Sequence, residues 1–140
     1  MLRHQSEMKT ETFVNCHEGT GELLCRWALA RGDSQLGIQF MHDDVIEPGA
    51  SIGEHRHDDE EVYFVVDGHG TMLLDGQSVP IGPGDVAMVQ PGHTHGLLNS
   101  TDGPKRLIVI CVKYARPARG VPSGDQTTNG NFLTSSVIAL

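Results

Sequence analysis

Three histidines and one glutamate have the residue types and spacing of a metal-binding set. His55 and His57 are separated by one residue, and Glu61 follows four residues after His57. In a strand, alternate residues share a face, so both imidazoles point the same way and Arg56 points the opposite way. Neutral imidazoles suit divalent metals of borderline softness, and a carboxylate offsets part of the ion's charge. The pattern therefore predicts a metal site that takes a further ligand from elsewhere in the chain.

His95 is the candidate for that further ligand. It stands at the start of another predicted strand, just after the turn at Pro91-Gly92. His93 shares the face of His95 if the strand extends that far, although the turn before it argues against this. In the first segment, Glu60 competes with Glu61, and the spacing favours Glu61. The expected ligands of one divalent ion are therefore His55, His57, Glu61 and His95.

Short strands separated by turns must position these residues. The predicted strands span residues 23–29, 36–41, a segment that follows the turn at 47–49 and runs to 57, and then 61–66, 71–74, 77–81, 85–89, 95–99 and 106–112. Asp75-Gly76 predicts a two-residue hairpin turn, because both residues tolerate the positive φ angles of a type I′ turn. Many short strands bounded by glycine or proline predict an antiparallel sandwich or barrel.

The same residues resemble the two motifs of the cupin superfamily. The first motif begins and ends with a glycine, and between them it has two histidines separated by one residue and then a glutamate. It is matched here by Gly49, His55, His57, Glu61 and Gly68. The second motif ends in a histidine followed by an asparagine, and it is matched by Gly84, Gly92, His95 and Asn99. Gln90 occupies the motif's proline position, with Pro91 beside it. The resemblance covers roughly residues 20–112.

The resemblance implies a single all-β domain with the cupin double-stranded β-helix, a jelly-roll barrel. We expect the barrel at residues 20–114, a polar N-terminal arm at 1–19 that is loose up to residue 12, and a C-terminal extension at 115–140. The resemblance also implies one bound divalent ion, either Mn, Fe, Ni or Zn, and a homodimer. The segment around the paired histidines is similar to that of small oxalate-binding and oxalate decarboxylase-like bacterial cupins.

An open metal site in a barrel predicts a small carboxylate or oxygenated metabolite as the ligand. We expect a metalloenzyme of the decarboxylase, lyase, isomerase or dioxygenase type; the alternative is a non-catalytic protein that binds a sugar acid or dicarboxylate. Tyr63 shares the face of Glu61 and is the candidate general acid, although a plain core role stands beside this. The candidate substrate-binding residues are Gln39, Met41 and Met88, with Ile38 and Phe40 as the alternative for the earlier strand.

Composition limits the remaining classes of function. The chain has 140 residues and a formal net charge of −8, without a basic stripe, which argues against nucleic acids and anionic membranes as partners. No apolar run approaches the ~20 residues of a spanning helix, and the polar N-terminus lacks the apolar region of a signal peptide. Its three cysteines, Cys16, Cys25 and Cys111, form no C-x-x-C pair, which favours reduced thiols in a cytoplasmic protein.

Overall fold

Ten β-strands in two sheets make up the part of the chain that the structure describes. The structure is a computed structural model and describes residues 1–99 and 107–114. The strands are β1 (Lys9–Val14), β2 (Glu22–Leu29), β3 (Ile38–Ile46), β4 (Ser51–Arg56), β5 (Glu60–Asp67), β6 (Gly70–Leu74), β7 (Gln77–Ile81), β8 (Val86–Val89), β9 (Thr94–Leu98) and β10 (Leu107–Tyr114), with two short 3-10 helices, η1 (Gln5–Glu7) and η2 (Cys16–Glu18). One sheet has the order β1-β2-β3-β10-β5-β8, and the other has the order β4-β9-β6-β7.

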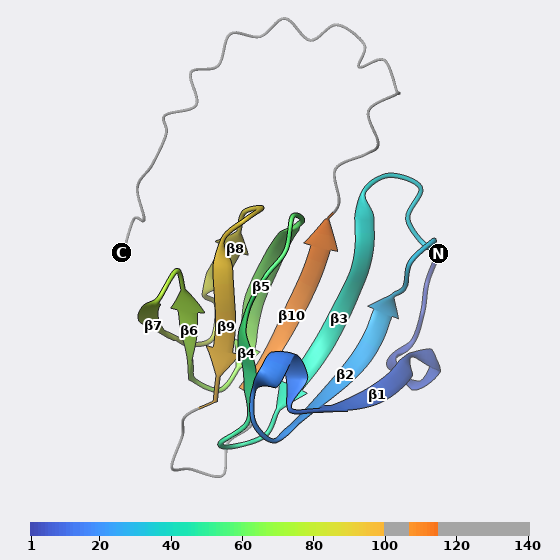
Figure 1. The fold of residues 1–140 in the computed structure, drawn as a ribbon. Helices are drawn as coiled ribbons and strands as arrows, with labels where there is room; N and C mark the ends of the chain where they lie inside the picture. Colours follow the sequence, from blue (N-terminus) through green and yellow to red (C-terminus); the bar gives the residue numbers. More distant parts are fainter. Residues whose placement is uncertain (100–106, 115–140) are drawn as a thin grey trace, which may run out of the picture.

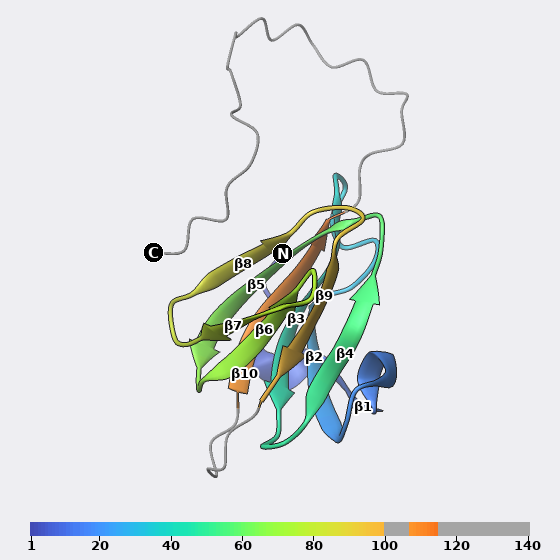
Figure 2. The same ribbon diagram turned by 60° about the vertical axis from the view of Figure 1, so that its left-hand side comes forward.

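The two sheets form two layers that face each other (Figures 1 and 2). Every strand pair within the described residues is antiparallel. The predicted hairpin joins β6 to β7, where Asp75 and Gly76 have φ angles of 47° and 77° and Leu74 pairs with Gln77. Both φ angles are positive, as a type I′ turn requires. These observations confirm the all-β jelly-roll barrel and its turn chemistry.

Apolar side chains from both sheets pack between the layers. Ile46 and Leu107 of the larger sheet and Met72 and Leu97 of the smaller one are at most 1% exposed. Burying such side chains stabilises the fold by roughly 1.5–3 kcal/mol each. Asn99 is also fully buried and donates its side-chain amide to the Ile46 carbonyl at 2.9 Å. The end of β9 is therefore fixed against β3, which holds the two sheets in register near the histidine-bearing strands.

The N-terminal arm is more ordered than its polar composition indicates. Residues 9–14 form β1, which pairs with β2 from Lys9 opposite Trp27 to Val14 opposite Glu22. The prediction of a loose segment up to residue 12 was therefore wrong for residues 9–12. The strand forms because its backbone completes hydrogen bonds along the edge of β2, and most of its polar side chains stay exposed. The predicted extension at 115–140 lies outside the described residues.

The turn η2 lies against the strand that carries His55. Its His17 has a positive φ of 50°, and the neighbouring Asn15 and Glu18 have φ angles of 54° and 62°. Positive φ angles are uncommon outside glycine. A Cβ atom on Gly53 would collide with the backbone oxygen of His17, and a Cβ on Gly19 would collide with that of Ser51. The two glycines therefore allow η2 to approach β4 closely at the edge of the predicted site.

Candidate metal centre

The structure brings the four predicted ligands together inside the barrel. They form the ligand cluster, which comprises His55, His57, Glu61 and His95, and their candidate ligand atoms all lie within 4.8 Å of one another. His55 of β4 stands directly opposite His95 of β9 in the strand register. His57 follows the end of β4, and Glu61 begins the inward-facing positions of β5. Two strands of one sheet and one strand of the other thus supply the ligands.

One carboxylate oxygen is the centre of the cluster. Glu61 Oε2 lies 2.9 Å from His95 Nε2 and 3.1 Å from His57 Nε2, and it accepts a hydrogen bond from the Tyr63 hydroxyl at 2.8 Å. His95 is fully buried and Glu61 is 4% exposed. Ligand atoms that share an ion with bonds of about 2.1 Å lie about 3 Å or slightly more from one another. The spacing of these atoms is therefore compatible with a common ion.

Backbone carbonyls orient two of the imidazoles. His55 Nδ1 lies 3.0 Å from the Gly53 oxygen, and His57 Nδ1 lies 3.0 Å from the Asp59 oxygen. A carbonyl oxygen only accepts, so each Nδ1 carries the proton and each Nε2 keeps a lone pair. This second hydrogen bond is typical of metal-binding histidines, where it fixes the ring and its tautomer. Both rings thus have Nε2 available for a metal ion.

The environment fixes the protonation states that a metal ion needs. Burial by itself would raise the pKa of Glu61, but hydrogen bonds from His95 and Tyr63 and the nearby His57 imidazole outweigh it and lower that pKa to about 2. Burial lowers the pKa of His55 to about 4. At neutral pH Glu61 is therefore a carboxylate and His55 is a neutral imidazole, the forms that coordinate metals.

A buried nitrogen of the cluster supports the fit of a metal ion. His57 Nε2 is buried and faces the Glu61 carboxylate, but it has no hydrogen-bond partner among the described residues. Buried polar atoms without partners are uncommon and call for an explanation such as an ion or a water. A set of three imidazoles and one carboxylate suits borderline divalent metals rather than hard cations that require oxygen ligands. The donor chemistry therefore fits the implied ion.

The two competing ligands lie apart from the cluster. Glu60 does not belong to it, and the side chain that points into it is that of Glu61. His93 precedes β9 rather than lying within it, and its side chain is 54% exposed. Its Nδ1 lies 2.6 Å from Asp75 Oδ2. The turn before β9 thus separates His93 from the inward-facing positions of that strand.

The ligand cluster opens into a cavity of about 590 Å³ between the sheets. Tyr63 lines it, and so does Phe40; Ile38, which was the other residue of the alternative for the earlier strand, does not. The three candidate substrate-binding residues, Gln39, Met41 and Met88, are not among the residues that line it. Met88 is 54% exposed, because β8 directs Ala87 and Val89 inward, and Gln39 donates to Asp59 Oδ1 at 3.2 Å.

Two residues that the sequence patterns did not single out also face the ligand cluster. His17 of η2 stacks on His55, with ring centroids 3.7 Å apart and planes 3° from parallel. Lys113 of β10 places Nζ 3.9 Å from Glu61 Oε1 and 3.6 Å from Asp59 Oδ2, and its side chain is 15% exposed. A lysine inside the apolar run of residues 107–114 was the available signal for Lys113. For His17, a lone histidine in a polar arm, there was none.

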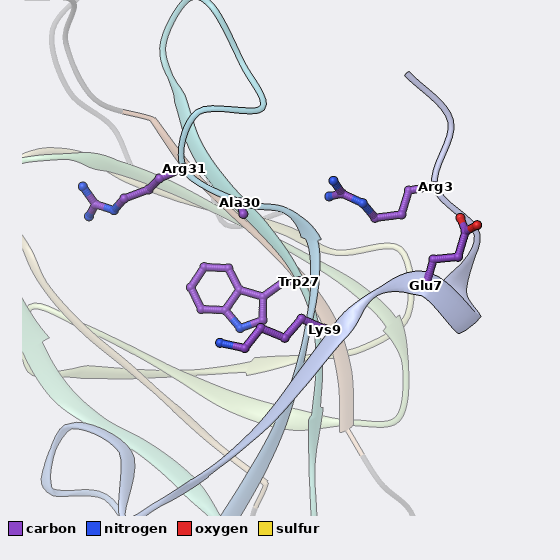
Figure 3. Close-up of a pocket in the computed structure, with 6 residues that line it drawn as sticks. All are labelled: Arg3, Glu7, Lys9, Trp27, Ala30 and Arg31. Atoms are coloured by element: carbon purple, nitrogen blue, oxygen red, sulfur yellow. The ribbon is translucent and has the colours of Figure 1, made fainter.

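A second pocket lies beside β1, and none of the predicted metal ligands lines it (Figure 3). It is lined by Arg3, Glu7, Lys9, Trp27, Ala30 and Arg31. Arg3 is held by Asp33 at 2.8 Å, and Lys9 is held by Glu11 at 2.6 Å, so both charges are compensated. Within residues 1–99 and 107–114, no lining residue of this pocket belongs to a cluster that could hold a metal ion. We therefore place the candidate site in the cavity between the sheets.

Replacing Tyr63 with phenylalanine is expected to weaken metal binding while the fold is kept. The hydroxyl donates to Glu61 Oε2 at 2.8 Å and so orients this ligand. Groups that orient a metal ligand typically contribute about 10- to 100-fold in affinity, so we expect the Kd for Mn²⁺ to rise about 10-fold. Calorimetric titration of metal-free protein measures the change. A Kd equal to that of the wild type would contradict the positioning role.

Comparison with known proteins finds one matching family model and several relatives. Residues 43–111 match the cupin domain family. The chain is 26% identical over 113 residues to an oxalate-binding protein of Thermotoga maritima, covering 80% of this chain and 93% of that protein. It is 33% identical over 98 residues to a 5-aminosalicylate 1,2-dioxygenase of Comamonas sp., covering 63% of this chain but 25% of the dioxygenase. The crystal structure of a predicted oxalate decarboxylase from Thermotoga maritima superimposes with a TM-score of 0.75 at 27% identity, covering 81% and 98% of the two chains.

Proposed function

Because this chain carries a cupin domain, we propose that its ligand cluster holds one divalent metal ion that binds a small carboxylate of the oxalate type. The observation that carries the proposal is the convergence of three imidazoles and one carboxylate, of which His55, His57 and Glu61 line a cavity of about 590 Å³. A bound ion with four protein ligands keeps one or two open coordination positions if it is five- or six-coordinate, and these positions can accept carboxylate oxygens. The ion is of the Mn, Fe, Ni or Zn class.

The charge of the cavity supports an anionic ligand. A divalent ion exceeds the single charge of Glu61, and Lys113 adds a cation that is 3.9 Å from Glu61 Oε1. Lys113 also lies over the Phe40 ring, 5.9 Å from its centroid, which keeps its ammonium group within the cavity wall. A fixed cation beside a metal ion attracts a second carboxylate group. A dicarboxylate thus suits the cavity better than a neutral ligand of the same size.

We propose an enzyme rather than a passive binder, with Tyr63 as the general acid. Its hydroxyl lies beside the ligand cluster, and Tyr63 lines the same cavity. The likeness to a protein described as a dioxygenase supports an enzyme, whereas the likeness to one described as an oxalate-binding protein is compatible with an enzyme or a binding protein.

No helix within the described residues is long and apolar enough to cross a membrane. A homodimer, a cytoplasmic location and the absence of nucleic-acid partners stay predictions.

Oxalate is expected to bind the metal-loaded protein and not the metal-free protein. Calorimetric titration with oxalate after loading with Mn²⁺, Fe²⁺, Ni²⁺ or Zn²⁺ measures this, and oxamide serves as the uncharged analogue of similar shape. Replacing Lys113 with methionine keeps the apolar stem and removes the charge, so we expect oxalate to bind about 10-fold more weakly, as for the loss of a charge-assisted contact.

Two results would contradict the proposed ligand class. One is oxalate binding that is unchanged by a chelator, and the other is equal binding of oxalate and oxamide. Loss of oxalate over time in the metal-loaded protein, against saturable binding without turnover, distinguishes the enzyme from the binding protein.

A further inference from the structure

A second group of side chains that could ligate a metal ion lines another part of the cavity. Cys25 of β2 stands directly opposite Asp44 of β3 in the strand register, and His42 lies two residues before Asp44 on the same face. These three residues form the thiol cluster, and their candidate ligand atoms all lie within 4.8 Å of one another. All three line the same cavity as three members of the ligand cluster, His55, His57 and Glu61. The thiol cluster takes no part in the function proposed above.

The thiol cluster leaves buried polar atoms without partners. Cys25 is fully buried and Asp44 is 3% exposed. Asp44 Oδ1 and His42 Nε2 have no hydrogen-bond partner among the described residues. A carboxyl group this deeply buried is costly unless it is paired, hydrogen-bonded or bound to a metal. A bound cation would satisfy the Asp44 oxygen, with the nearby His42 imidazole as a second ligand.

We propose that Cys25, His42 and Asp44 hold a second divalent ion of the thiophilic class represented by Zn²⁺. His42 Nδ1 lies 3.9 Å from Asp44 Oδ1, close to the ligand–ligand separation of about 3.5 Å in a tetrahedral site. The cavity supplies the fourth ligand, a water molecule. One thiolate and one carboxylate balance the ion's two charges, so the interior gains no net charge.

Neighbouring aromatic rings hold His42 in place for this role. Its ring stacks on Phe40 with centroids 4.2 Å apart and planes 8° from parallel, and it meets the edge of Trp27 at 4.2 Å. Trp27 is itself fixed, because its indole nitrogen donates to Glu11 Oε2 at 2.8 Å. Burial lowers the pKa of His42 to about 4, which keeps the imidazole neutral at pH 7. The ring is therefore rigid and in the form that binds a metal.

The two clusters differ in the metal that they favour. The ligand cluster has nitrogen and oxygen donors, whereas the thiol cluster includes a sulfur donor, which selects softer ions. Burial raises the pKa of Cys25, and it also raises that of Asp44 to about 7, so both groups release protons when the ion binds. The sulfur donor also gives the thiol cluster a spectroscopic signature that the ligand cluster lacks.

Titration of metal-free protein with Co²⁺ alone tests the thiol cluster directly. We expect two Co²⁺ ions per chain and a sulfur-to-cobalt charge-transfer band in the near ultraviolet. Replacing Cys25 with serine should remove the band and one equivalent of Co²⁺, while Cys16→Ser and Cys111→Ser keep both. Replacing His55 with alanine should remove the other equivalent and keep the band, which separates this inference from the proposed function.

Specific results of this titration would overturn the second site. A single Co²⁺ without the band in the wild type overturns the second site, and so does a band that persists in Cys25→Ser or disappears in Cys16→Ser. Should Cys25→Ser fail to fold by circular dichroism, Asp44→Asn provides the same test with a side chain of equal size. We expect Asp44→Asn to weaken binding of the second equivalent by about 100-fold or more, since a direct ligand matters at least as much as a group that orients one.

Discussion

With His55 replaced by alanine, the protein is expected to lose the ion of the ligand cluster and the thermal stability that this ion gives. The change leaves three ligands of four, so the affinity for Mn²⁺ should fall by about 100-fold or more, beyond the loss of an orienting group. An ion present at about 1,000 times its Kd stabilises the native state by about 4 kcal/mol. For a chain of this size, that corresponds to about 10 °C in the unfolding midpoint.

Thermal unfolding with and without Mn²⁺ measures this effect, and metal analysis of the same samples gives the stoichiometry. The wild type should unfold about 10 °C lower after chelation, whereas in His55→Ala chelation should lower the midpoint by about 4 °C or less. His93→Ala is the matched control, because His93 is exposed and lies outside the ligand cluster. If His93→Ala lost the ion as well, or if His55→Ala kept it, the assignment of the ligand cluster would be wrong.

Three of the four residues of the ligand cluster could be predicted because the pattern that indicates them is local in the sequence. Alternation in one strand gives His55 and His57 a common face, and a short connection returns Glu61 to them. His95 was harder, since only the fold brings β9 opposite β4. Here the resemblance to a family supplied what periodicity alone did not. The same turn chemistry that placed His95 inward excluded His93, which precedes the strand.

The cavity wall could not be predicted because both alternation phases of one strand look alike. In β3, one phase contains Gln39, Met41 and Asp43, and the other contains Phe40, His42 and Asp44. Each phase mixes apolar and polar residues, so the pattern does not show which phase faces inward. The structure turns the second phase inward, which hides two titratable side chains inside the barrel. Polar residues that face a cavity are where pattern reasoning fails most easily.

β1 was missed for a different reason. Its sequence, residues 9–14, alternates threonine and charged residues before the single pair Phe13-Val14. Such a segment has no apolar face to bury, and as a strand it gains mainly from backbone pairing with β2. That gain depends on tertiary structure and leaves no local signal. The consequence reaches the site, because β1 leads into η2 and thereby places His17 against His55.

Replacing Asp44 with asparagine is expected to stabilise the metal-free protein most at alkaline pH, and by less than half as much at pH 5. Burial raises the pKa of Asp44 from 3.8 to about 7, with Asp43 and Glu61 adding repulsion and Cys25 opposing it through a hydrogen bond. Between these two pKa values the native state holds a proton that the unfolded state has lost. The free energy of unfolding therefore falls as pH rises from about 4 to about 7, by up to about 4 kcal/mol.

Urea unfolding of chelated protein from pH 5 to pH 8 measures this dependence. Asparagine cannot ionise, so the Asp44→Asn variant should lack the decline and be about 2–4 kcal/mol more stable at pH 8. Asp43→Asn is the control, since it removes the partner of Arg26, 2.9 Å away, and only one of the smaller contributions to the Asp44 pKa, so this variant should keep most of the wild-type decline. Parallel curves for wild type and Asp44→Asn would contradict the buried ionisation.

Zinc should reverse the order of stability if the thiol cluster binds it. The wild type then gains the binding energy of an ion that neutralises the Asp44 carboxylate, and Asp44→Asn gains far less. The same side chain is thus expected to destabilise the empty barrel at pH 8 and to stabilise the zinc-bound one. This reversal follows from one physical cause, the burial of a carboxyl group that has an oxygen without a partner among the described residues.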